Sequence, residues 1–246
     1  MSGKKICFVS TYIGDVDKLD ISSNFKTNNK YDYYFFTNLK KHNIPNNSWK
    51  HVRINMNDFK EFRSNVFISR YYKFMLHKVL KQFNKDYDFV IYCDAFLSPK
   101  VEKDWDEIVN NCLESDFPIM QYDHFYSKSV IDEMFAIVKC EKETIINAEK
   151  LKKYFEILSP EININTKQFY ENTVLGYSLK NEKVIKFLEN FWKYYNCIEN
   201  PSYRDQCLWN FVYILYNYKA YIVKSFKTKY FDGKIKIRRK IEDYTK

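Results

Sequence analysis

"YDFVIYCDAFLSP", residues 87–99, places an uncharged run of five residues, Phe89 to Cys93, directly before a carboxylate, Asp94. A continuous run of aromatic and β-branched residues is typical of a central parallel strand that is covered on both faces. Because an unpaired carboxylate is costly inside such a sheet, Asp94 is expected at the carboxyl end of the strand. In open α/β sheets that end is where ligands bind. The stretch therefore predicts an α/β fold and makes Asp94 the first candidate site residue.

The chain as a whole has the composition of a globular protein. Its 246 residues are 46% apolar and 29% charged, which suits one domain over residues 1–246 and argues against a disordered chain. No apolar run approaches the roughly 20 residues of a membrane span. The stretch "MSGKKICFVS" leads into a strand without a signal-peptide core, and six scattered cysteines fit small buried side chains. These features predict a cytoplasmic protein without a transmembrane segment.

The net charge of +9 is concentrated in a basic tail, residues 224–246, in which Asp232-Gly233 is expected to form a turn. We favour a solvent-exposed edge strand for this tail over a phosphate-binding role. No helix-turn-helix, zinc-finger or ribonucleoprotein motif occurs in the sequence, so nucleic acid is not an expected partner. A basic nucleic-acid-binding protein is therefore the least favoured alternative.

Strand and helix patterns alternate along the chain, which predicts a mostly parallel central sheet flanked by helices. Strands are expected in "KKICFVSTYI", "YDYYFFTNLK", "WKHVRINM", the opening run, "FPIMQYD", the segment 159–179 and "AYIVK". Helices are expected at about 58–83, from Ser98-Pro99 onward, and near 128–138, 142–157, 181–196 and 202–217. In the last of these, Ser202 is the expected N-cap and Asp205 complements the helix dipole.

Polar residues follow several of the predicted strands and would form one rim if the sheet is parallel. They are Thr11, Tyr12, Thr37, Asn38, Asp94, Asp123 and His124. Each alone fits a turn former or a cap. Their coincidence indicates a site.

The expected helix 58–83 carries a basic stripe about 80° wide when it is projected at the helical period. The stripe consists of Arg63, Arg70, Lys73, His77, Lys81 and Asn84. It is either a solvent face with lysines that reach water, or it directs Arg70, Lys73 and His77 into a cleft beside Asp94. The sequence leaves both readings open.

Motifs of several common enzyme classes are missing. Four glycines, at positions 3, 14, 176 and 233, cannot form a Rossmann fingerprint or a Walker loop. No nucleophile elbow supports Ser–His–Asp hydrolysis, and the four histidines lack H-E-x-x-H spacing. The sequence therefore argues against a dinucleotide oxidoreductase, a P-loop NTPase and a zinc hydrolase.

Five segments resemble, in order and spacing, a glycosyltransferase-like family long catalogued only as a domain of unknown function, which includes plant proteins implicated in cell-wall polysaccharide synthesis. The segments are "SRYYKFMLHKVL", "YDFVIYCDAF", "QYDHFYSKSVIDE", "QFYENTVLGYSLKN" and "FWKYYNCIENPSYRDQCLWNFVY". The layout, over roughly residues 5–220, is also similar to that of small nucleotide-sugar transferases of large DNA viruses. Such a source implies the host cytoplasm and would suit the bias toward Lys, Asn, Ile, Tyr and Phe.

The resemblance implies a GT-A-like, Rossmann-related domain that moves a sugar from a nucleotide-diphosphate donor, such as a UDP-sugar, to a glycan or protein hydroxyl. In GT-A enzymes a D-x-D motif binds the donor and Mn²⁺ or Mg²⁺, which offsets the charge on the leaving diphosphate. Here the motif is Asp94-Ala95-Phe96, so a second acid is missing. Asp94 would bind the metal with a partner from elsewhere, or the basic stripe replaces the ion. We expect a metal.

The same resemblance suggests a role for each candidate residue. An inverting transferase needs a carboxylate that deprotonates the acceptor hydroxyl; Asp205 is the first choice and Glu171 the second. Asp123 and His124 would contact the acceptor or complete the metal shell, and His124 joins the catalytic candidates. The expected donor-binding residues are Thr11, Tyr12, Thr37, Arg70, Lys73, His77, Asp94 and Arg204. A retaining mechanism, or an inactive sugar- or phosphate-binding module of the same fold, is the alternative.

Overall fold

The structure is a computed structural model that describes residues 4–15, 27–41, 49–83, 85–100, 102–225 and 227–233. Asn84 of the basic stripe and residues 234–246 of the basic tail lie outside this range. Within it, none of the helices has the length and apolar character needed to cross a membrane.

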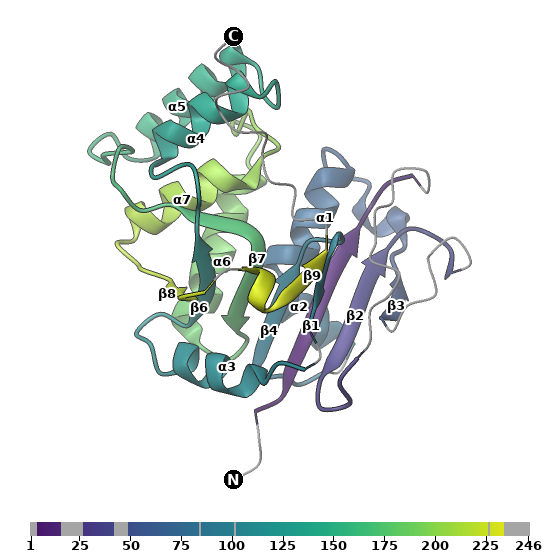
Figure 1. Cartoon of the computed structure of the whole chain (residues 1–246). Helices are drawn as coiled ribbons and strands as arrows, with labels where there is room; N and C mark the ends of the chain where they lie inside the picture. Colours follow the sequence, from purple (N-terminus) through teal and green to yellow (C-terminus); the bar gives the residue numbers. More distant parts are fainter. Residues whose placement is uncertain are drawn as a thin grey trace.

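A seven-stranded sheet runs through the molecule in the order β3-β2-β1-β4-β7-β6-β8 (Figure 1). The strands are β1 (Ile6–Tyr12), β2 (Asp32–Thr37), β3 (Lys50–Arg53), β4 (Phe89–Cys93), β6 (Ile119–Asp123), β7 (Tyr170–Ser178) and β8 (Tyr221–Ile222). β7 pairs antiparallel with both of its neighbours, and the other four pairings are parallel. The mixed α/β class and the mostly parallel sheet predicted from the sequence are therefore confirmed.

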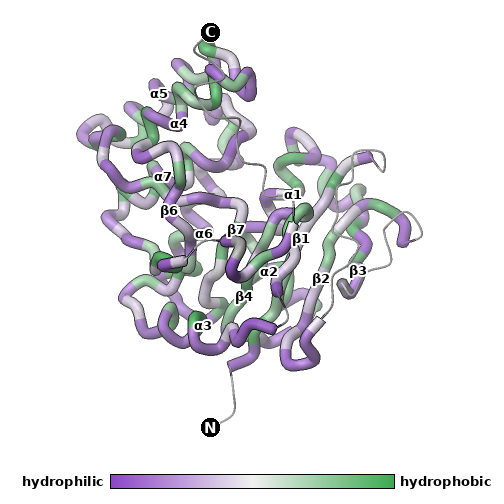
Figure 2. Tube along the Cα trace, viewed as in Figure 1, coloured by the Kyte–Doolittle hydropathy of each residue, from purple (hydrophilic) through white to green (hydrophobic). Residues whose placement is uncertain are grey.

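Alternating side chains of the central strands build two cores, one on each face of the sheet. Val90 and Tyr92 of β4 point to one core, and Phe89 and Ile91 point to the other, as the period of two along a strand requires. Figure 2 shows the apolar residues as green segments along the central strands. The uncharged run that opens the sequence is thus buried on both faces.

Six helices pack their apolar residues into the core that contains Tyr92. These are α1 (Asn65–Phe74), α2 (Leu76–Gln82), α4 (Val130–Lys139), α5 (Ile145–Leu158), α6 (Glu182–Tyr195) and α7 (Asp205–Leu215). The other core is covered by α3 (Trp105–Leu113) and by a two-stranded sheet of β5 (Leu97–Pro99) and β9 (Phe231–Gly233). Two short 3₁₀ helices, η3 (Met56–Phe59) and η4 (Lys227–Lys229), complete the described elements.

The single helix expected at about 58–83 is wrong, because the chain forms η3, α1 and α2 instead. The break between α1 and α2 lies at Met75. There the hydroxyl of Tyr177 accepts the backbone N–H of Leu76 at 3.2 Å and donates to the carbonyl of Lys73 at 3.1 Å. A side chain inserted into the helical hydrogen-bond ladder is a recognised cause of a kink.

The helix expected from Ser98-Pro99 is also wrong. Residues 97–99 form β5, which pairs antiparallel with β9, and α3 begins later, where the side chain of Asp104 caps the N–H of Asp106. Gly233 of β9 has a φ of +137°, and a Cβ there would collide with the backbone oxygen of Phe96. Residues 231–233 of the basic tail therefore pack against the loop that follows Asp94, and the turn expected at Asp232-Gly233 is wrong, because both residues pair with β5.

Candidate functional site

The carboxyl ends of β1, β2, β4 and β6 lie along one edge of the sheet, because these four strands run in the same direction. This edge, here called the rim, carries the predicted strand-end residues. The chain passes from β1 outward to β2 and β3 and then returns to place β4 on the other side of β1. Ligands bind at such a reversal of strand order. At this switch point lie Thr11 and Tyr12 on β1 and Asp94 after β4.

Asp94 is half-buried at the rim, and its backbone is held on both sides. Its N–H donates to the carbonyl of Thr173 at 2.9 Å, and its carbonyl accepts the N–H of Leu97 at 2.8 Å. Tyr92 donates its hydroxyl to Oδ1 of Asp94 at 3.1 Å. Burial raises the pKa of the Asp94 carboxyl, and the nearby cations Lys73 and Arg70 oppose that rise.

Asp205 is the centre of a charged cluster on the α1 side of the sheet. It accepts hydrogen bonds from Arg70 Nε at 2.8 Å, from Lys73 Nζ at 3.0 Å and from Asn172 Nδ2 at 3.1 Å. Burial opposes the charged form of Asp205, but Arg70 and Lys73 outweigh it and hold the pKa of this carboxyl well below its usual range. Asp205 therefore stays ionised at neutral pH.

The two cations of the cluster differ in what they can reach. The Lys73 side chain is only 2% exposed, and its ammonium lies 5.2 Å from the ring centroid of Tyr92. The Arg70 side chain is 25% exposed and uses only Nε on Asp205. Among the described residues, no hydrogen-bond partner is found for its two terminal nitrogens. Arg70 can therefore offer a forked pair of donors to an anion.

A buried polar chain runs from this cluster through β7 and β6 to Trp209, further along α7, and sequence reasoning missed it. Oδ1 of Asn172 accepts from Gln121 Nε2 at 2.9 Å, and Oε1 of Gln121 accepts from Trp209 Nε1 at 3.0 Å. Gln121 and Asn172 are 0% and 2% exposed. The available signal was the position of Gln121, a polar residue within the otherwise apolar start of the strand "FPIMQYD".

The rim residues of β1 and β2 differ in whether their hydroxyl groups have hydrogen-bond partners. The Thr11 hydroxyl is buried and has no hydrogen-bond partner within the described chain, whereas the Tyr12 hydroxyl donates to the carbonyl of Asp15 at 2.8 Å. Thr37 accepts the N–H of Leu39 at 3.1 Å. Thr37 thus acts as a turn former, and Thr11 is left with an unused polar group.

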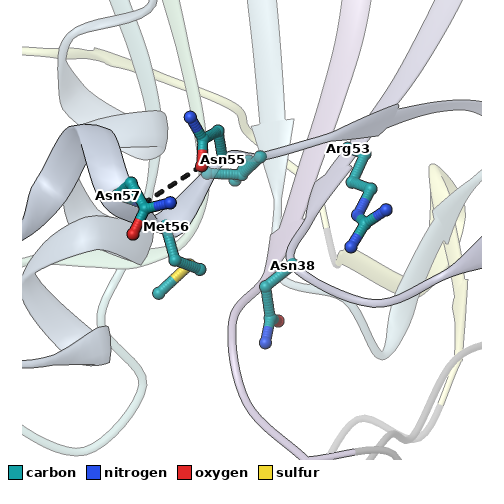
Figure 3. A pocket seen from close by; sticks show the side chains of 6 residues that line it. Asn38, Arg53, Asn55, Met56 and Asn57 are labelled. Atoms are coloured by element: carbon teal, nitrogen blue, oxygen red, sulfur yellow. Dashed lines mark hydrogen bonds between the residues drawn. The ribbon is translucent and has the colours of Figure 1, made fainter.

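An open pocket of about 500 Å³ lies beside the ends of β2 and β3 (Figure 3). Its polar lining comes from Asn38, Arg53, Asn55 and Asn57. The Asn38 side chain is fixed by two hydrogen bonds to the backbone of Gly14, at 3.0 and 3.2 Å. The pocket offers amide groups and one guanidinium to a polar ligand.

His77 is not brought to the rim with Arg70 and Lys73. It follows the break in the helix, and its Nε2 lies 3.7 Å from Glu189 on α6. It lines a separate pocket with Lys85, at the opposite edge of the sheet from Asp94. Burial lowers the pKa of His77 to about 4. The prediction that His77 lies in a cleft beside Asp94, together with Arg70 and Lys73, is therefore wrong.

The remaining candidates lie on or near the rim and are engaged in local contacts. Glu171 accepts from the Thr173 hydroxyl at 2.7 Å and pairs with Lys227. His124 accepts the N–H of Ser127 through Nδ1 at 2.9 Å, and its Nε2 lies 3.8 Å from Glu133.

Arg204, not Ser202, occupies the N-cap position of α7, and its side chain does not cap the helix. Ser202 lies before the cap position, because α7 begins at Asp205; it accepts the N–H of Arg204 at 3.1 Å and donates to Glu143 at 2.9 Å. The Nε of Arg204 is buried and has no hydrogen-bond partner within the described ranges.

The side chains around Asp94 do not fit a divalent cation. Within the described ranges, no group of three His, Cys, Asp or Glu side chains could hold a metal. The cations Arg70 and Lys73 flank Asp94 instead, and both oxygens of Asp205 are already occupied by their hydrogen bonds. A metal ion needs several anionic or neutral oxygen ligands and is repelled by such neighbours.

In comparisons with known proteins, neither a family model nor a curated protein matches the chain significantly.

Proposed function

We propose that this protein is a glycosyltransferase with a GT-A-like fold, which moves a sugar from a nucleotide-diphosphate donor to a hydroxyl acceptor. The observation that carries the proposal is the place of Asp94. This carboxylate ends β4 at the switch point of the sheet, on the face where Arg70 lies. An acid beside a forked cation at this place suits a polar, anionic ligand such as a sugar diphosphate.

The nucleotide would occupy the pocket at the ends of β2 and β3. Amide groups of Asn38, Asn55 and Asn57 can donate to and accept from a nucleobase or a ribose. Thr11 and Tyr12, at the end of β1, lie between this pocket and Asp94 in the strand order. The diphosphate would then reach Arg70, and Asp94 would accept hydrogen bonds from hydroxyls of the donor.

Asp205 is better suited to positioning than to proton transfer. A general base must be free to take a proton, and its pKa should lie near the working pH. The pKa of Asp205 is held well below its usual range, and its oxygens hold Arg70, Lys73 and Asn172. We assign it the role of fixing Arg70 toward the diphosphate.

Glu171, at the start of β7, is the better candidate for the base. Its side chain is 21% exposed. It lies at the rim, because it comes three residues before Val174, which pairs with Cys93 at the end of β4. It would have to part from Lys227 to act.

No catalytic step is assigned to a metal, because the donor set does not fit one. The growing charge on the leaving diphosphate would be offset by Arg70 directly and by Lys73 through the local potential. Phe96 stands where the D-x-D motif of GT-A enzymes has its second acid. This difference favours the alternative of a binding module without turnover.

Calorimetry with a panel of nucleotide sugars tests the proposal, followed by detection of released nucleotide. Binding with transfer or slow donor hydrolysis supports the enzyme, and binding without any turnover supports the module. Failure of every nucleotide and nucleotide sugar to bind would reject both.

A further inference from the structure

A third pocket, of about 370 Å³, lies at the other end of the rim, where β6 ends and β7 begins. Its polar lining includes Asp123, His124, Lys128, Lys167, Gln168 and Lys219. Three different segments of the chain thus bring an ammonium group to one pocket: the loop after β6, the segment before β7 and the segment before β8. The proposed transfer reaction does not yet use this feature.

The charges of this pocket are unbalanced. Three lysines face one carboxylate, Asp123. Lys128 donates to the carbonyl of His124 at 3.0 Å, and Lys167 and Lys219 have no acidic partner among the described residues. Ammonium groups that outnumber the nearby carboxylates create a positive potential, which attracts an anionic ligand.

The floor of the pocket is held by buried contacts, and the lysines extend from it. His124 is 8% exposed and packs edge-on against Phe169, with ring centroids 5.3 Å apart. Gln168 donates to the carbonyl of Tyr218 at 2.7 Å, which ties the segment of Lys167 to that of Lys219. Preorganisation of this kind lowers the cost of binding.

The pocket lies within reach of the proposed donor site. Strand spacing places the Cα of Asp123 on the order of 14 Å from that of Asp94, since two strand steps and three residues separate them. A ligand of two or three sugar units would span this distance. The pocket is thus suitably placed for the acceptor and lies apart from the donor pocket at β2 and β3.

We propose that this pocket binds a negatively charged group on the acceptor, namely a phosphate, a sulfate or a carboxylate attached to a glycan. This inference rests on the proposed function. Lys167 and Lys219 provide the charge, and the buried floor of His124 and Phe169 supports the sugar that carries the anion.

Backbone amide NMR titrations at low salt test the proposal with three probes: glucose 6-phosphate, glucose 6-sulfate and glucuronate. Glucose serves as the uncharged comparison. We expect the charged sugars to shift the signals of residues 123–128 and 167–170, and to bind at least tenfold more tightly than glucose. Which anion binds best then distinguishes the three acceptor chemistries.

The double variant Lys167→Ala/Lys219→Ala should weaken binding of the charged sugars at least tenfold. The control variant Lys153→Ala/Lys183→Ala removes the same charge from exposed positions on α5 and α6 and should change it less than twofold. Equal losses in both variants, or charged sugars that bind no better than glucose, would overturn the inference. UDP calorimetry on the same variants follows the donor site separately, so a failed donor site and a failed acceptor pocket give different results.

Discussion

Lys73 donates a hydrogen bond to Oδ2 of Asp205 at 3.0 Å, although 132 positions separate the two residues in the sequence. The lysine side chain is 2% exposed and that of the aspartate 7%. A buried charge that loses its partner is strongly destabilising, which makes this pair a sensitive part of the fold. It also orients Arg70, which shares the same carboxylate.

Asp205→Asn is expected to lower the free energy of unfolding by about 3–5 kcal/mol, because it leaves Lys73 buried beside a neutral amide. A residue that merely complements the dipole of α7 would cost about 0.3–1 kcal/mol. Urea denaturation measures the difference. Glu182→Gln, an exposed acid in the first turn of α6, is the matched control and should show only the smaller effect.

The same variant separates positioning from proton transfer. If Asp205 positions Arg70, UDP binding should weaken along with stability. A variant that keeps full stability and UDP affinity but loses transfer would instead establish Asp205 as the base.

Asn172→Leu is expected to destabilise the protein by about 1–3 kcal/mol, because Gln121 and Asp205 each lose a hydrogen-bond partner in the interior. Asn165→Leu, at an exposed loop position, is the control and should stay within about 0.5 kcal/mol of the original protein. Thermal and urea unfolding check both variants. Equal stability of the two would mean that the polar chain through Gln121 contributes nothing to the fold.

Arg70→Gln is expected to weaken UDP binding at least tenfold, since the variant loses the charge and the forked donors that would face the diphosphate. Treatment with a chelator should change UDP affinity less than twofold, because the residues around Asp94 do not fit a metal. Calorimetry with and without EDTA measures both effects. A tenfold loss on chelation would restore the metal expected from the Asp94 motif.

The strands could be predicted from the sequence because each is marked by its own residues. Phe89 to Cys93 carries no charge and is rich in β-branched and aromatic side chains, and the structure buries all five residues. The break at Met75 could not be predicted, since it depends on the hydroxyl of Tyr177, a residue about one hundred positions away. Likewise β5 exists only because β9 returns from the carboxyl-terminal region to pair with it.

The candidate site follows the same division. Asp94 could be placed from its own strand, and Arg70 and Lys73 could be placed on one face by helical period. The contacts that Asp205 makes with these two cations could not be predicted, because they depend on the packing of α1 against α7. The same holds for Asn172 on β7, which lies between Asp205 and Gln121. His77 was misplaced because the helical period was extended across a break that only tertiary contacts reveal.

Asp94→Asn is expected to separate stability from function. Burial raises the pKa of Asp94 above its value in the unfolded chain, so the ionised carboxylate lowers the stability of the folded protein at pH 7, and removing the charge should leave stability unchanged or raise it slightly. Binding of a nucleotide sugar should nevertheless weaken at least tenfold. Urea unfolding and calorimetry on one preparation measure the two quantities. Full donor affinity in this variant, or in Asp94→Ala, would remove Asp94 from the site.

His77 is expected to make the folded protein sensitive to mild acid. Burial lowers the pKa of His77 to about 4, below the value of about 6.5 in an unfolded chain. The unfolded state therefore binds more protons than the folded state between these values. The contribution of neutral, buried His77 to the free energy of unfolding is complete above pH 6.5 and is lost as the pH falls toward 4.

Urea denaturation at pH 7.5, 6.5, 5.5 and 4.5 measures this contribution. His77→Gln removes the titrating group and should show a shallower decrease, by roughly 1–3 kcal/mol between the first and last pH. His51→Gln serves as the control. His51 is half-buried and contacts the carbonyl of Leu39, which follows β2. Because acid also protonates the carboxylates that pair with lysines, only the difference between the variants is assigned to His77. Identical pH profiles for His77→Gln and the original protein would show that His77 is solvated and titrates normally in the fold.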